Sequence, residues 1–174
     1  MGEEKRRKDK ILASSPVCYM CGERRPSTID HVPARICFRN KVGPEGFEFP
    51  ACDFCNHKDR KIEQVVAFLI KIGDHSDPQM SENEFLKHYQ AVKNNAREAL
   101  PRLDLSAREK RRALKKINPN FYRGIGITDA SVAEFNEEIS TYFDRFGEKL
   151  AKALYFKHLG LPCPKDSIIK IAHL

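Results

Sequence analysis

Two Cys-x-x-Cys pairs constrain this chain of 174 residues more than any other feature of its sequence. Cys18 and Cys21 form the first pair, Cys52 and Cys55 form the second, and 30 residues lie between them. Each pair can grip one side of a tetrahedral Zn²⁺ ion, so four thiolates would close a structural site. The segment that carries them has few apolar residues of its own, so we expect zinc to supply much of its folding free energy.

The other two cysteines, Cys37 and Cys163, belong to no such pair, and we expect them to be buried thiols. A thiol redox protein is an alternative use of paired cysteines, and tightly bound zinc in the purified protein would exclude it. No stretch approaches the length of a membrane span, and the polar start of the chain lacks the apolar core of a secretory signal. We therefore expect a cytoplasmic protein without a membrane partner, in which paired cysteines are more often metal ligands than disulfides.

Composition divides the chain into three parts. Residues 1–15 contain a charge run and are interpreted as a basic N-terminal tail, residues 16–73 as a zinc-bound module of loops and short strands, and residues 74–174 as a helical region. The predicted fold class is α+β and mainly helical.

Helix starts in the second half of the chain are indicated by three capping boxes. They begin at Ser81, Ser106 and Ser131, each followed three residues later by a glutamate. The last box is predicted to open the longest helix, which ends at Gly160. Another predicted helix leaves the second cysteine pair as NHKDRKIEQVVAFLIKIG, and its apolar half, 65–72, must be buried.

An Asp-His pair, Asp30 and His31, lies between the cysteine pairs. If four cysteines saturate the zinc, this pair is free for other chemistry. The zinc would hold Asn56, the residue after the last cysteine, close to the strand that carries the pair. Asp and Asn oxygens are hard ligands suited to Mg²⁺ or Mn²⁺, and a neighbouring histidine can remove a proton from water. A cation, a base and a basic surface together describe metal-assisted phosphodiester hydrolysis.

The composite pattern CYMCG, STIDHVPAR and PACDFCN resembles the HNH endonucleases of the zinc-containing type, which have a ββα-metal active site. The resemblance covers roughly residues 16–70. The arrangement of these motifs is similar to that of a phage junction resolvase. It implies that His31 is the general base, that Asp30 and Asn56 hold the catalytic Mg²⁺ or Mn²⁺, and that the four cysteines hold structural zinc. Products would then carry a 5′-phosphate.

The chain departs from this family at two positions. The middle Asn of the signature is expected a few residues before the second cysteine pair, where the sequence reads GFEFPA, and Asn40 is the nearest upstream asparagine. In the family that residue steadies the loop that carries the base, so its role is unassigned here. The final His of the signature is Asn56, and the adjacent His57 is an alternative ligand if the helix begins one residue later.

Basic residues around this motif are candidates for contacts with nucleic acid, expected to be DNA. Arg35, four residues after His31, could hold the scissile phosphate or could be a solvated loop residue. The net charge of +7 favours a polyanionic partner without proving one. The candidate phosphate contacts, each of which could equally lie on a solvated helix face, are Lys58, Arg60, Lys61, Arg108, Arg111, Arg112 and Lys115.

The sequence thus predicts a metal-dependent endonuclease. The alternative is a zinc-stabilised module that binds nucleic acid or protein without cutting. The oligomeric state is left open, a dimer included, and the helical C-terminal region matches no motif that assigns it a role.

Overall fold

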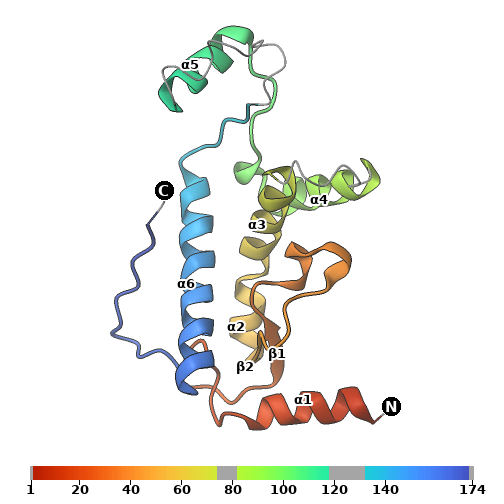
Figure 1. Ribbon diagram of the computed structural model, residues 1–174, viewed down its shortest axis with the longest axis vertical. Helices are drawn as coiled ribbons and strands as arrows, with labels where there is room; N and C mark the ends of the chain where they lie inside the picture. The colour runs from red at the N-terminus through yellow and green to blue at the C-terminus, as the bar shows by residue number, and fades with distance from the viewer. Residues whose placement is uncertain (1, 74–81, 118–131, 173–174) are drawn as a thin grey trace.

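The computed structural model describes residues 2–73, 82–117 and 132–172 (Figure 1). It is mainly helical, with a single two-stranded sheet in the described part, which agrees with the predicted fold class. In chain order the elements are α1 Glu3–Ala13, β1 Thr28–His31, η1 Arg35–Cys37, η2 Arg39–Lys41, β2 Glu48–Ala51, α2 Asp53–Lys58, α3 Arg60–Gly73, α4 Glu82–Asn95, η3 Arg97–Ala99, α5 Ala107–Ile117 and α6 Glu138–Leu159.

The sheet is an antiparallel hairpin of β1 and β2. Its register places Thr28 opposite Ala51 and His31 opposite Glu48. Helix α2 begins directly after β2, so strand, strand and helix follow one another in the cysteine-rich segment. Because side chains alternate along a strand, Thr28 and Asp30 share one face of β1, and His31 belongs to the other.

The helix predicted after the second cysteine pair is broken in two. Asp59 separates α2 from α3 and has φ −96° and ψ 0°, outside the helical range. The Asp59 side chain is buried, whereas most of α2 before it is exposed to solvent. The prediction of a buried apolar half is confirmed for residues 65–69, whereas Ile70 is 43% exposed.

Most of the segment interpreted as a basic N-terminal tail, residues 1–15, forms the helix α1, which the sequence analysis did not predict. No side chain of α1 is buried, and the helix contacts β1 and β2. Good helix formers fill it, with Glu3 and Glu4 in the first turn and Lys10 in the last, as the helix dipole favours. The helix could not be predicted from hydrophobic periodicity, because the sequence of α1 has no apolar face.

The predicted boundaries in the C-terminal half hold in part. The Ser106 capping box is confirmed, since Ser106 and Glu109 bond to each other's backbone N–H groups at the start of α5. Helix α6 ends at Gly160, which adopts φ +70° as a left-handed C-cap. Its predicted start was wrong: Glu134 pairs its backbone with Arg102, and α6 begins only at Glu138. Ser81 and Ser131 lie outside the described residues.

Two hydrophobic clusters organise the described residues. One is built from the four cysteines with Tyr19, Phe49 and, from α6, Ala153 and Phe156. The other joins α3 to α4 and η3. Helix α6 also packs alongside α3 (Figure 1). The cysteine-rich segment 16–73 therefore shares its core with the C-terminal helical region.

Candidate metal centre and candidate active site

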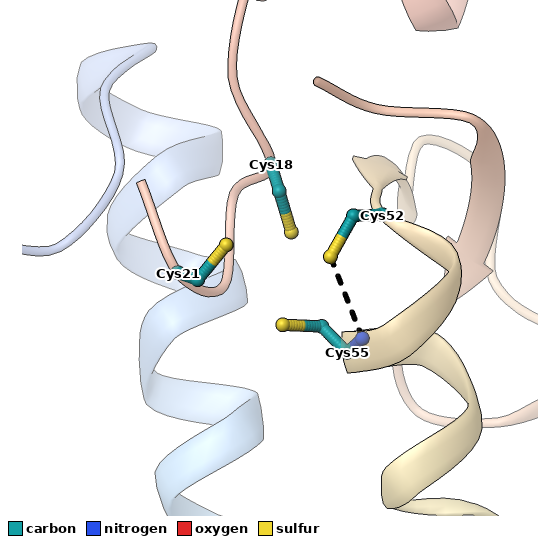
Figure 2. A group of neighbouring side chains, drawn as sticks. All are labelled: Cys18, Cys21, Cys52 and Cys55. Carbon is teal, nitrogen blue, oxygen red and sulfur yellow. Dashed lines mark hydrogen bonds between the residues drawn. The ribbon is translucent and has the colours of Figure 1, made fainter. Parts of the chain in front are cut away.

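The four cysteines of the two pairs converge on one point (Figure 2). Their sulfur atoms all lie within 4.8 Å of one another, and three of the residues are buried. The first pair sits on a turn in which the Gly22 N–H donates to the Cys18 carbonyl at 2.8 Å. The second pair opens α2, where Cys52 Sγ accepts from the Cys55 N–H at 3.5 Å. The cluster fits a tetrahedral metal ion such as zinc, as the spacing predicts.

The thiols of this cluster differ in acidity. Burial raises the pKa of both Cys18 and Cys55. Burial also acts on Cys21, but hydrogen bonds from the Arg24 and Glu23 backbone outweigh it and lower the pKa of that thiol to about 7. A bound zinc ion would ionise all four, because the metal stabilises thiolates directly. Cys37 and Cys163 are each partly buried and lie outside the cluster.

Asp30 is buried, with 3% of its surface exposed, and both of its oxygens have partners. Its Oδ2 accepts from the Tyr19 hydroxyl at 2.6 Å. The Lys149 Nζ of α6 lies 3.0 Å from Oδ1 and 2.8 Å from Oδ2, and it also contacts Glu63 of α3. Burial would lower the pKa of Lys149, but the charges of Asp30 and Glu63 outweigh it and raise that pKa.

Asn56 lies near the other end of β1. Its Nδ2 donates to Thr28 Oγ1 at 3.0 Å, so Asn56 lies beside the strand that carries Asp30. His57 is exposed and bonds within its own helix, with Nδ1 2.8 Å from the Asp53 carbonyl oxygen. Among the described residues, the four cysteines are the only group of three or more Cys, His, Asp or Glu side chains close enough to share a metal ion. A divalent ion on Asp30 and Asn56 would have to displace Lys149 Nζ from both oxygens of Asp30.

His31 ends β1 and faces a different environment from Asp30. Its side chain is 28% exposed, and its Nδ1 lies 3.5 Å from Oε1 of Glu48 on β2. Burial lowers the pKa of His31 below its usual value, although the Glu48 charge opposes this. The residue lines two open cavities of about 630 Å³ and about 760 Å³. Arg7, Arg35 and Glu48 line both of them.

The basic residues nominated from the sequence fall into three places: beside His31, on α2 and α3, and on α5. Arg35 lies beside His31, where its Nε donates to the Lys41 carbonyl at 3.2 Å. Lys61 pairs with Glu98 at 2.7 Å. Helix α5 lies at the opposite end of the molecule from the hairpin (Figure 1). The nominated side chains in α2, α3 and α5 are all exposed: Lys58, Arg60, Lys61, Arg108, Arg111, Arg112 and Lys115.

Three residues of these sites were not found from the sequence. Glu48 stands in the GFEFPA stretch, where the family has its middle asparagine, and lies opposite His31 in the sheet register. Asn40, by contrast, is exposed, with φ +54°. Arg7, which pairs with Glu48, belongs to α1, a helix that the sequence analysis did not predict. Lys149 falls on the inward stripe of α6, and a single lysine among apolar residues was the available signal.

A scan against protein-family models finds no matching family, and searches of curated proteins and of solved structures find no match. Over the part of the chain that the structure describes, no helix combines the length and apolar character needed to cross a membrane.

Proposed function

We propose that this protein is a nuclease that hydrolyses phosphodiester bonds, with DNA as the first substrate to test and His31 as the general base. The observation that carries the proposal is the position of His31. It lies where two open cavities meet, with a carboxylate on its Nδ1 side and with Arg7 and Arg35 in the cavity walls. The resemblance of residues 16–70 to HNH endonucleases points to the same histidine.

His31 is suited to accept a proton near neutral pH. Its lowered pKa favours the neutral ring, which is the form that can act as a base. Since Glu48 lies on the Nδ1 side, the Nε2 nitrogen would take the proton from a water molecule. The water oxygen would attack phosphorus, the bond to the 3′-oxygen would break, and that oxygen would take a proton from solvent. The proposed products are a 5′-phosphate and a 3′-hydroxyl.

Positive charge for the developing phosphorane would come from the cavity walls. The Arg35 Nε donates to the Lys41 carbonyl, and Arg7 pairs with Glu48. Both arginines line the same cavity as His31. Preorganised cations beside a reacting phosphate stabilise the charge of its transition state. The resemblance adds Mg²⁺ or Mn²⁺ on Asp30 and Asn56, but Lys149 occupies both oxygens of Asp30, so we derive no step through that ion.

A second candidate function is a zinc-stabilised module that binds nucleic acid without cutting it. The buried pairing of Asp30 with Lys149 favours it, because that pairing withholds the carboxylate that the family uses for its metal.

Nicking of a supercoiled plasmid by the zinc-loaded protein tests the proposal, in buffer with and without added Mg²⁺ or Mn²⁺. We expect His31→Ala to lose about 10²- to 10⁴-fold in rate, the usual contribution of a general base. His158→Ala is the matched control, because His158 is an exposed histidine in the last turn of α6. Equal nicking by wild type and His31→Ala would contradict the proposal. Retention of plasmid, single-stranded DNA or RNA in a gel-shift assay without cleavage would instead establish the binding module.

A further inference from the structure

The ammonium group of Lys149 lies in a buried cluster of acidic side chains. Lys149 is 2% exposed, and its Nζ contacts Asp30 of β1 and Glu63 of α3. A third carboxylate, Asp59, is buried at the break between α2 and α3, and the charges of both Lys149 and Asp30 act on it. Three chain segments therefore supply acidic groups around one lysine that a fourth segment, α6, brings in.

This ammonium holds the position in which a cation would bind Asp30. It reaches both oxygens of that carboxylate, at 2.8 Å and 3.0 Å, and has a second carboxylate on Glu63. A divalent ion on the same oxygens would have to expel the ammonium first. That exchange is costly, since it would leave Lys149 charged in a buried position without its partners.

We propose that Lys149 is the resident cation of the Asp30 site, so that the wild-type chain binds no divalent ion through Asp30. The acidic cluster is a site for a hard cation that the protein fills with its own side chain. Carboxylate oxygens suit Mg²⁺ and Mn²⁺, so removing the ammonium should convert the cluster into a divalent-metal site. The inference goes beyond the proposed function, because it holds whether or not the protein cuts nucleic acid.

Mn²⁺ binding to the zinc-loaded full-length chain, followed by electron paramagnetic resonance without nucleic acid, tests this inference. Lys149→Met removes the ammonium and keeps an unbranched apolar side chain of similar length. We expect wild type and Asp30→Asn to bind Mn²⁺ equally weakly. Lys149→Met should gain a Mn²⁺ site at least tenfold tighter than any in wild type, and Lys149→Met with Asp30→Asn should lose it.

Lys152→Met is the matched control. Lys152 lies in the same helix and pairs with Glu148 at 2.5 Å, but it remains partly exposed and outside the acidic cluster. This variant should bind Mn²⁺ as wild type does.

Two outcomes would overturn the inference. The first is Mn²⁺ binding by wild type that Asp30→Asn abolishes, and the second is a folded Lys149→Met chain that gains no site. If Lys149→Met folds only when Mn²⁺ is present, the inference is supported, because a bound ion then replaces the ammonium. If it folds under neither condition, the comparison of wild type with Asp30→Asn decides alone. Because the assay measures no cleavage, its failure is distinct from failure of the nuclease proposal.

Discussion

The two candidate cation sites of the hairpin region are built in opposite ways. At the first, four thiols face one another and fit a metal ion taken from solution (Figure 2). At the second, the carboxylates of Asp30 and Glu63 face an ammonium that belongs to the chain. The first joins two short motifs, whereas the second joins residues 119 positions apart. In this chain the cysteine spacing predicts the first cluster, whereas the second depends on Lys149, which the sequence around Asp30 does not indicate.

Loss of zinc is the largest effect that this comparison predicts. Cys52→Ser removes one thiolate and the sulfur that accepts from the Cys55 N–H. Zinc binding to such sites contributes on the order of 10 kcal/mol, so we expect the variant to retain no zinc and to lose its cooperative thermal transition. Metal analysis by mass spectrometry and circular dichroism melting would measure both.

Cys163→Ser provides the control for that experiment, since Cys163 is partly buried and outside the cluster. It should retain zinc and melt as wild type does. A Cys52→Ser chain with full zinc content and an unchanged melting temperature would rule out the four-cysteine site.

Removal of the internal cation is the second effect in size. Lys149→Met leaves buried carboxylates without their counter-ion, which costs about 3–5 kcal/mol when a buried pair loses one partner. Lys152→Met should cost less than about 1 kcal/mol, because its pair with Glu148 is partly solvated. Urea denaturation at neutral pH would compare them, and equal losses would show that the Asp30 pairing is no stronger than a surface pair.

The same pair has a defined pH dependence. Asp30 and Glu63 raise the pKa of Lys149 above its ordinary value of 10.5, so its stabilisation is complete below that value. It is lost as the pH rises through the raised pKa of the folded state. The stability difference between wild type and Lys149→Met should therefore narrow in strongly alkaline buffer, and a difference constant with pH would count against a charged Lys149.

The smallest predicted effect concerns the histidine on the other face of β1. The charge of Glu48 raises the pKa of His31 against the larger effect of burial, so Glu48→Gln should lower that pKa further. NMR titration of the imidazole would measure the change, and the acidic limb of any nicking activity should move to lower pH with it. Glu45→Gln, an exposed change in the preceding loop, is the control. An upward shift in Glu48→Gln would contradict the assignment of Glu48 as the partner of His31.

Local chemistry made part of this structure predictable. The cysteine spacing predicted the four-cysteine cluster, the apolar run predicted the buried part of α3, and Ser106 and Gly160 marked helix ends correctly. Each of these signals acts through residues close together in the chain, or through a metal geometry that allows few alternatives.

Features that depend on distant partners were missed. Helix α1 has no buried side chain, and its Arg7 pairs with Glu48, 41 positions away. The break at Asp59 and the late start of α6 arise where buried polar groups and a backbone bridge override local propensity. The partner of Asp30 was also missed, because nothing near Asp30 in the sequence indicates Lys149.

The link between Asp30 and Lys149 also limits how this protein can change through recombination. A gene segment that ends at Gly73 would carry all four cysteines, but it would leave the acidic cluster without its ammonium and remove Ala153 and Phe156 from the core. We therefore expect that this segment would not fold stably when joined to another protein. Substitutions at positions 30 and 149 should therefore occur together, because changing either residue alone leaves the other as a buried charge without its partner.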